Sequence, residues 1–342
     1  MLARSTTLVH PNGAELQTPL LVSSFSSKGF RFRKRGNKEY TESFEFLKMT
    51  ADALTESVLL SAYDLKHFYN VKELRKIRLF PRFTFVDSGG YETSDGFDSS
   101  EAYKHPIKKR KWTIVDYKKI LNSWPEYYPS IIVSYDHGEE RRISLSAQIK
   151  RASELFSRYP QSLHDFLIKP EKKGELLNVD QILNSASKLK SFKIIGFTEK
   201  ELGDSLIERM FNIKKIRESF DKIDIKAPIH IFGNLDPLTT VLYFISGAEI
   251  FDGLTWLRFS FHNGKSLYDQ NMDAIKGRIN QTDSLNKKTS LWENVVYMGN
   301  LQSEMRAFLK QVSDDGNSNN AFDNFRFYSD KIKEAAKNLY SK

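Results

Sequence analysis

Cysteine is absent from this 342-residue chain, and only seven histidines are scattered along it. The absence of cysteine excludes disulfides, a thiol nucleophile and any zinc or iron–sulfur site that needs cysteine ligands. The chain also has no run of eighteen apolar residues, and its first residues, Met-Leu-Ala-Arg-Ser-Thr-Thr, lack the apolar core of a signal peptide. We therefore expect a soluble, cytoplasmic protein with no membrane partner.

The composition allows a large core and an anionic partner. Hydrophobic residues make up 40% of the chain, which suits either two average domains or one large α/β barrel. The formal net charge is +9, from 52 Lys and Arg against 43 Asp and Glu. This excess favours an anionic partner such as nucleic acid, but many basic proteins bind none, so the charge counts as support only.

Short apolar segments alternate with segments of helical apolar spacing over most of the chain. About eight strands are predicted, the number that closes a (β/α)8 TIM-type barrel, whose active site lies at the carboxyl ends of the strands. A doubly wound open sheet is the alternative, but the chain lacks Gly-x-Gly-x-x-Gly after its first strand and Gly-x-x-x-x-Gly-Lys-Ser/Thr throughout. The predicted strands cover residues 20–22, 57–63, 83–87, 130–136, 164–170, 192–196, 228–233 and 249–252.

The last quarter of the chain is organised differently. We predict a single domain over residues 1–342, in which residues 254–290 form a basic insertion and residues 291–342 a helical extension. Within the extension, helices are expected at 290–312 and 321–340, separated by a polar linker. The second of these helices would close the barrel.

Three predicted strands end at an aspartate. The apolar run from Phe83 stops at Asp87 and is followed by a glycine pair, and later strands end at Asp136 and Asp252. A single Asp-Ser-Gly-Gly is more often an ordinary turn, but the recurrence at strand ends favours an active site. The apolar strand around His230 suggests instead that this histidine belongs to the core.

Basic segments, some interleaved with aromatic residues, are candidates for nucleic-acid contact. Solvated basic loops are the alternative reading for each of them. Trp112, Trp256 and Phe30 lie near these segments and could stack on bases. The basic residues predicted to contact nucleic acid are Arg33, Lys34, Arg35, Lys109, Arg110, Arg258 and Lys265.

Several separated motifs, taken together, resemble the tRNA-guanine transglycosylase superfamily over roughly residues 8 to 255. Each motif is modest alone, but all of them occur in order at successive strand ends. They are Val86-Asp-Ser-Gly-Gly-Tyr91, Ser134-Tyr-Asp136, Ile195-Gly-Phe-Thr-Glu-Lys-Glu201, Phe232-Gly-Asn-Leu-Asp-Pro-Leu238 and Gly247-Ala-Glu-Ile-Phe-Asp252, with His10-Pro-Asn-Gly to Thr18-Pro19 before the first strand.

The resemblance implies an enzyme that exchanges guanine in a nucleic acid for a 7-deazaguanine base. Asp252 would be the nucleophile that attacks the sugar C1′ and forms a covalent intermediate, and Asp87 would be the general acid/base. Asp136 would accept hydrogen bonds from the N1–H and 2-amino edge of the purine. The backbone at Gly196 and Phe197 would contact the base carbonyl.

The other residues predicted to bind substrate surround this pocket. Tyr91 would stack on the base, and Glu201 is similar to the family's recognition glutamate, although it could simply begin an exposed helix. Lys169 could contact the ligand or pair with Asp136. The remaining predicted substrate-binding residues are Ser88, Gly89, Gly90 and Gly233.

Departures from the family pattern concern its zinc site and its nucleic-acid face. The tRNA enzymes usually hold zinc with three cysteines and a histidine, so no zinc or other cofactor is expected in a chain without cysteine. The strand ending Ile168-Lys169-Pro170 also differs from the glutamine and glycine usual there. These features resemble the DNA-directed branch of the superfamily, which inserts bases such as 7-cyano-7-deazaguanine into DNA. The implied partners are DNA and the free base; a DNA-opening helper protein and oligomerisation stay open.

Three other functions compete with this reading. A zinc-free tRNA-guanine transglycosylase would use the same base pocket. A catalytically silent subunit that binds nucleic acid is disfavoured, because it has no need of Asp87, Asp136 and Asp252 together. A barrel glycosidase could use Asp87 and Asp252 as its carboxyl pair.

Overall fold

Eight parallel strands close into a barrel in the computed structural model of the protein, confirming the predicted α/β barrel. Each strand pairs with the next along the chain, and β12 pairs with β3 to close the circle. The structure describes residues 1–35, 38–54, 56–69, 74, 82–94, 110–125, 128–136, 143–172, 174–315 and 318–341. The barrel strands are β3 (Leu20–Phe25), β6 (Ser57–Ser61), β7 (Phe83–Asp87), β8 (Ser130–Val133), β9 (Leu163–Ile168), β10 (Ile194–Thr198), β11 (Ile229–Phe232) and β12 (Ile250–Gly253).

Side chains alternate between two apolar layers along each strand, as the pleat of a strand requires. Phe83 and Phe85 of β7 belong to the inner layer, which fills the barrel, whereas Val86 packs outward against the helices. The same alternation carries polar side chains of other strands into the interior, stacked toward the carboxyl end. These inward polar residues are Ser24, Asp87, Asp165, His230 and Asp252.

Helices begin where the sequence supplies capping side chains. Thr113 accepts the backbone N–H of Asp116, and Asp236 accepts those of Leu238 and Thr239, which satisfies donors left open at a helix N-terminus. The α-helices that lie between barrel strands are α1 (Glu42–Thr50), α2 (Ala62–His67), α4 (Gly90–Thr93), α5 (Ile114–Ser123), α6 (Leu145–Phe156), α7 (Val179–Asn184), α8 (Ala186–Leu189), α9 (Leu206–Lys222) and α10 (Pro237–Ile245).

Beyond the last barrel strand, the predicted basic insertion contains regular structure. It includes a small antiparallel pair of strands, and its end belongs to a 33-residue helix, α13, which begins at Asp283 rather than at the predicted residue 290. Helix α13 packs against β3 and α1, and Gln302 accepts the backbone N–H of Leu21 at 2.9 Å. The elements are α11 (Thr255–Arg258), β13 (Ser260–His262), β14 (Lys265–Leu267), α12 (Asp269–Ile275), α13 (Asp283–Asp315), α14 (Ser318–Ala321) and α15 (Ser329–Tyr340).

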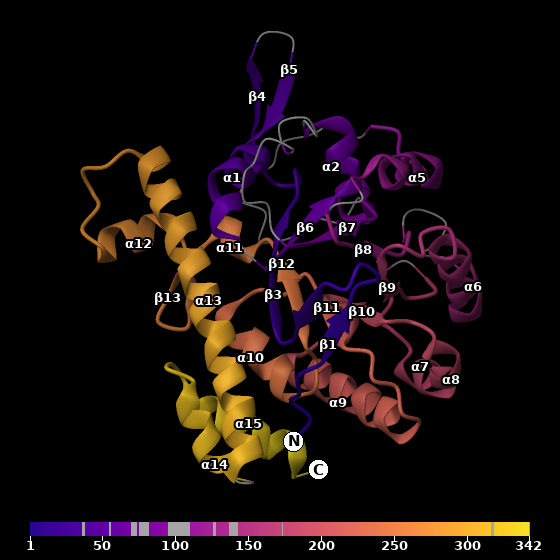
Figure 1. Ribbon diagram of the computed structural model, residues 1–342. Helices are drawn as coiled ribbons and strands as arrows, with labels where there is room; N and C mark the ends of the chain where they lie inside the picture. Colours follow the sequence, from indigo (N-terminus) through magenta and orange to yellow (C-terminus); the bar gives the residue numbers. More distant parts are fainter. Residues whose placement is uncertain are drawn as a thin grey trace.

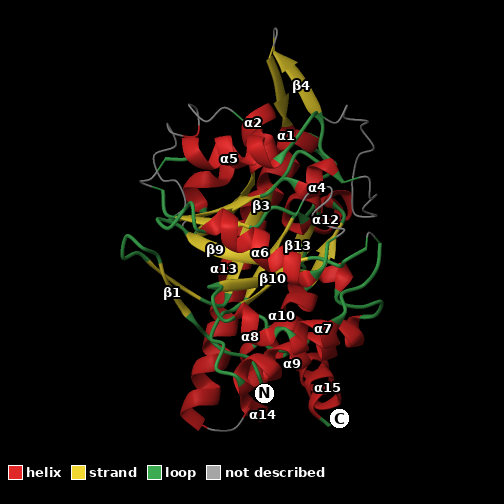
Figure 2. Ribbon diagram, turned by 90° about the vertical axis from the view of Figure 1, so that its right-hand side faces the viewer, coloured by secondary structure: helices red, strands yellow, loops and turns green. Residues whose placement is uncertain are grey.

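Besides β13 and β14, two further hairpins of the described residues lie outside the barrel. The pair β1 (Thr7–Val9) and β2 (Glu15–Gln17) precedes the first barrel strand, and the pair β4 (Phe32–Arg35) and β5 (Lys38–Thr41) projects away from the barrel (Figures 1 and 2). The two chain ends meet at the opposite side, where Tyr340 Oη accepts the backbone N–H of Leu2 at 2.8 Å (Figure 1). The β4–β5 hairpin therefore lies far from the termini, beyond the carboxyl end of β3.

Candidate active site

A cavity of about 280 Å³ lies at the carboxyl ends of the barrel strands. It brings together seven of the residues predicted from sequence, drawn from five different strand ends and the segments after them. This is the position at which barrel enzymes carry their active sites. The seven predicted residues that line it are Asp87, Tyr91, Asp136, Lys169, Gly233, Asp252 and Arg258.

Asp252 projects into this cavity from the end of β12 and is held through both carboxylate oxygens. Ser24 donates its hydroxyl to Oδ2 at 2.6 Å, and the backbone N–H of Gly233 donates to Oδ1 at 3.3 Å. His230 Nε2 lies 3.2 Å from the same Oδ1. Two hydrogen-bond donors and a nearby imidazole, from β3 and the carboxyl end of β11, thus surround one carboxylate that is 5% exposed, a geometry suited to a preorganised nucleophile.

His230 is fully buried and hydrogen-bonded, as expected of a core histidine, but its two polar neighbours are carboxylates. Its Nδ1 lies 2.6 Å from Oδ2 of Asp165, so the imidazole bridges two carboxylates in the barrel interior. Burial alone would lower the pKa of His230, but the two carboxylates raise it to about 9. The imidazole is therefore protonated at neutral pH.

Asp87, at the end of β7, is an acid whose charged neighbours disfavour its ionised form. Burial is the main reason that the pKa of Asp87 lies well above its usual value, and the negative charges of Asp136 and Glu92 raise it further. The backbone N–H of Gly89, at 3.2 Å from Oδ2, opposes the shift only in part. A carboxyl group whose pKa is raised in this way can hold a proton near neutral pH and release it to a ligand.

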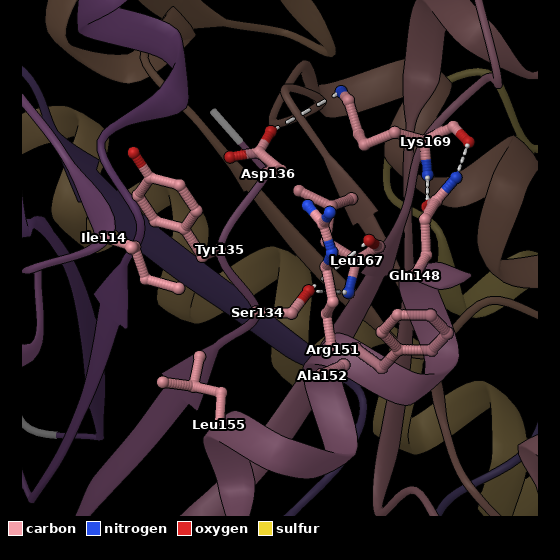
Figure 3. A pocket seen from close by; sticks show the side chains of 11 residues that line it. Ile114, Ser134, Tyr135, Asp136, Gln148, Arg151, Ala152, Leu155, Leu167 and Lys169 are labelled. Carbon is pink, nitrogen blue, oxygen red and sulfur yellow. Dashed lines mark hydrogen bonds and ion pairs between the residues drawn. The ribbon is translucent and has the colours of Figure 1, made fainter. Parts of the chain in front are cut away.

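Asp136 lies in the wall of the cavity and is anchored by a neighbouring strand end. Ser88 donates its hydroxyl to Oδ1 of Asp136, and Lys169 Nζ lies 4.0 Å from Oδ2. Figure 3 shows Lys169 and Asp136 pointing toward each other across the gap between their strands, with Gln148 beside the backbone of Lys169. Gln148 exchanges two hydrogen bonds with that backbone, at 2.9 and 3.0 Å, which fixes where the lysine begins.

The ammonium group of Lys169 lies within ion-pair distance of two carboxylates and donates a hydrogen bond to a hydroxyl. It lies 2.8 Å from Oε2 of Glu201 and donates to Oγ1 of Thr198 at 2.6 Å, while the residue is only 4% exposed. The expectation that Lys169 could pair with Asp136 is thus confirmed, and Glu201 is its closer partner. Glu201 acts behind Lys169 and is not among the residues that line the cavity.

Gly89 and Gly90 allow the chain to turn tightly beside Asp136. Gly89 has φ +84°, a left-handed conformation that favours glycine. A side chain at Gly90 would collide with the carboxylate of Asp136, and one at Gly89 would collide with Tyr63. Neither glycine lines the cavity; both instead let Asp87 and Asp136 come close together.

One rim of the cavity combines an aromatic ring with two cations. The ammonium of Lys28 lies 4.4 Å from the ring centroid of Tyr91, and Arg258 donates to the Tyr91 hydroxyl at 3.0 Å. Arg258 is 7% exposed, so it belongs to the cavity wall and not to an open surface. Tyr91 is held at both its ring face and its hydroxyl.

The predicted contact segment on β10 lies deeper than expected. Phe197 is fully buried and packs outward, and Gly196 lies between Asp165 and Phe232, where a Cβ atom would be too close to both. Neither residue lines the cavity. The chain reaches it slightly later, at Thr198, Glu199 and Lys200.

The predicted nucleic-acid contacts are distributed over several regions. Arg110 pairs with Glu39 at 2.7 Å, and Lys265 lies exposed on β14. Arg33, Lys34 and Arg35 lie in β4, where the structure describes their backbone only. Lys109 lies outside the described residues.

The prediction that Trp112, Trp256 and Phe30 could stack on bases was wrong. The side chains of Trp112, Trp256 and Phe30 are 5%, 0% and 3% exposed, so none presents a ring face to a ligand. The indole N–H groups instead tie loops together: Trp112 donates to the carbonyl of Ser88 at 2.9 Å, and Trp256 to that of Ser24 at 3.2 Å. These tryptophans support the site from behind.

Sequence reasoning missed several residues of the site. Asp165 and His230 lie within apolar strands, where an acid and an imidazole are costly unless paired, and that cost was the available signal. Glu92, 8% exposed, lines the cavity and accepts the Ser26 hydroxyl at 2.5 Å, but no motif marked it. Ser24 could have been found by counting alternate positions along β3.

Comparison with protein-family models finds no match to this chain, and comparison with curated proteins finds none either. Among the residues that the structure describes, no group of three or more His, Asp or Glu side chains is placed to hold a metal ion. None of the helices in the described ranges combines the length and apolar character needed to cross a bilayer.

Proposed function

We propose that this protein is a DNA guanine transglycosylase, which replaces guanine in DNA by a 7-deazaguanine base through a covalent aspartyl–sugar intermediate. One observation carries the proposal: a carboxylate held by two hydrogen bonds and a nearby imidazole, Asp252, and a carboxyl group with a raised pKa, Asp87, line one cavity. Base exchange needs these two groups, a nucleophile for the sugar and a proton carrier for the base. The motif resemblance to the tRNA-guanine transglycosylase superfamily supports the same assignment.

In the first half of the reaction, a carboxylate oxygen of Asp252 attacks C1′ of the target nucleotide. The bond between C1′ and N9 breaks, its electron pair goes to the purine, and Asp87 donates a proton to the departing base. In the second half, the incoming base loses its N9 proton to the Asp87 carboxylate. N9 then attacks C1′, and the ester electron pair returns to Asp252.

Recognition of the base is assigned to Asp136. Its carboxylate lies in the cavity wall and would accept the N1–H and 2-amino hydrogens of a guanine-like edge, a bidentate arrangement. The cavity volume of about 280 Å³ lies near the lower end of the roughly 300–1,000 Å³ typical of ligand sites. This size suits one base and its sugar, with Tyr91 along the ring face.

DNA is proposed as the acceptor on two grounds. The motifs resemble the DNA-directed branch of the superfamily, and the rim residues Lys28, Lys200 and Arg258 supply positive charge beside the cavity. The target guanine must leave the base stack, at a cost of a few kcal/mol in a duplex. Single-stranded or locally opened DNA should therefore react faster than a closed duplex.

The test is exchange of radiolabelled guanine into DNA and into tRNA in parallel, with single-stranded and duplex DNA as separate arms. Wild type, Asp252→Ala and Asp87→Ala are compared, with Asp224→Ala, an exposed aspartate on the surface, as the matched control. Label in DNA only, lost in both cavity variants and retained in the control, supports the proposal. Label in tRNA identifies the alternative acceptor, and label in neither overturns base exchange by the isolated protein.

A further inference from the structure

Three ionisable side chains form a line through the barrel interior toward the cavity. Asp165 of β9 and His230 of β11 are both fully buried, 0% exposed, and only Asp252, at the outer end of the line, reaches the cavity. The links are 2.6 Å from Asp165 Oδ2 to His230 Nδ1 and 3.2 Å from His230 Nε2 to Asp252 Oδ1. The imidazole therefore connects a buried acid to the nucleophile.

Packing fixes the plane of this imidazole. The ring of Phe232 stacks on it with centroids 3.8 Å apart, and Phe85 meets it edge-on at 5.5 Å. The charged groups that act on His230 are the carboxylates of Asp165, from β9, and Asp252, from β12. The hydrogen bond from Nδ1 to Asp165 and the packing of both aromatic rings hold His230 in one orientation, with Nε2 facing Asp252 Oδ1 at 3.2 Å.

Stability alone does not explain a buried acid–imidazole pair. Replacing a buried ion pair with well-packed apolar side chains is often neutral or stabilising, because the desolvation cost offsets much of the attraction. The neighbouring interior positions are filled by Phe85, Phe232 and Leu167. Apolar side chains could therefore fill the positions of Asp165 and His230 as well. The pair is better explained by what it does to Asp252.

Building on the proposed function, we propose that Asp165 and His230 are positioning residues that hold a fixed positive charge against Asp252 throughout the reaction. Before attack, the imidazolium lies against Oδ1 and keeps the carboxylate aimed at C1′. In the second half, when the C1′–O bond breaks and its electron pair returns to Asp252, the same charge stabilises the leaving carboxylate. His230 keeps its proton in both steps, and Asp165 is what keeps it protonated.

This role predicts how the two residues depend on each other. Asp165→Asn preserves the shape but removes one of the two charges that raise the pKa of His230, so the histidine should lose its proton at lower pH. His230→Gln keeps a donor toward Asp252 but carries no charge at any pH. The matched control is His164→Gln, in the same strand as Asp165, because His164 stacks on Phe156 and bonds the carbonyl of Tyr159, away from Asp252.

The first measurement needs no turnover: NMR titration of the His230 ring protons in wild type, Asp165→Asn and Asp252→Asn. The proposal is supported if the pKa of His230 is near 9 in wild type and falls by at least about one unit in each variant, because each variant removes one of the two carboxylates beside His230. A wild-type pKa at or below the ordinary value of about 6.5 overturns it, whether or not base exchange is observed.

The second measurement is the pH profile of single-turnover adduct formation between protein and DNA. Wild type and His164→Gln should keep their rates up to about pH 9, whereas Asp165→Asn should lose at least about tenfold between pH 7 and pH 8.5. His230→Gln should be slow at all pH values and show no basic limb. A uniform loss in Asp165→Asn with an unchanged profile indicates a structural role and contradicts the proposal. Absence of an adduct in wild type contradicts the proposed function instead, and the titration still decides the pair.

Discussion

Lys169 places its ammonium group 4.0 Å from Oδ2 of Asp136 and 2.8 Å from Oε2 of Glu201. One buried cation thus balances the acid assigned to base recognition and a second acid behind it. Because Lys169 also lines the cavity, it can contact a ligand without leaving these partners. Under the proposed function, Lys169 serves recognition and Asp252 is the nucleophile.

Lys169→Ala should therefore reduce activity less than Asp252→Ala. A hydrogen bond to a charged group contributes about 1.5–3 kcal/mol, so the expected loss in kcat/KM is roughly tenfold to a hundredfold, mainly through KM for the base. Asp252→Ala should abolish exchange. Lys172→Ala, which removes an exposed lysine paired with Glu175, is the control. Equal and complete loss in both cavity variants, with intact folds, would overturn this ranking.

Asp87→Asn should stabilise the fold while abolishing exchange. The raised pKa of Asp87 means that the folded protein binds its proton more tightly than the unfolded chain does. Stability therefore falls as pH rises from the unfolded pKa through the folded one, so the buried carboxyl group is a net cost at pH values above the unfolded pKa. A neutral amide removes this cost, worth about 1.4 kcal/mol for each pKa unit. Urea unfolding at pH 8 measures the gain; a variant less stable than wild type contradicts it.

The buried His230 should make the unfolding free energy depend on pH in the neutral to basic range. The folded pKa of His230, about 9, exceeds the unfolded value of about 6.5, so its contribution is complete below pH 6.5 and is lost as pH rises through 9. The loss is about 3 kcal/mol. The double variant Asp165→Asn/His230→Gln lacks both titrating groups, so its unfolding free energy should fall less between pH 6.5 and 9.5. Parallel curves for the two proteins would refute this assignment.

Gly90→Ala should damage the base pocket. The added Cβ would meet the carboxylate of Asp136, which must then move from its bond with Ser88. Overpacking of this kind costs about 1–3 kcal/mol, and we expect it to appear as weaker base binding by calorimetry. Gly299→Ala on α13, where the new methyl group meets open space, should instead stabilise the protein by up to about 1 kcal/mol. Unchanged base affinity in Gly90→Ala would argue against Asp136 as the recognition residue.

Strand ends were predictable from sequence because two signals coincide there. An apolar run of strand length followed by an acid or glycine marks both the strand and its carboxyl end, and Asp87, Asp136 and Asp252 were found in this way. The helix caps Thr113 and Asp236 also have the residue type and position that local sequence favours at a helix start. These features depend on neighbours in the chain.

Features that depend on partners from distant strands were not predictable in the same way. His230 was expected in the core and lies there, but its carboxylate partners were not predicted, because Asp165 and Asp252 are 65 and 22 residues away in sequence and meet it only across the closed barrel. Trp112 and Trp256 looked available for stacking because their burial depends on loops that pack over them. The partners of His230 and the burial of the two tryptophans depend on how the barrel and its loops close, and not on the local sequence pattern.

The most direct test of the account is to identify the residue that bonds to the sugar. Wild-type protein is incubated with single-stranded DNA without an incoming base, denatured, digested, and mapped by mass spectrometry, alongside Asp252→Asn. A deoxyribose-linked adduct on the peptide containing Asp252, absent from the variant, is the predicted result. Release of guanine without any protein–DNA adduct, or an adduct on another carboxylate such as Asp87, would contradict the central claim that Asp252 is the nucleophile.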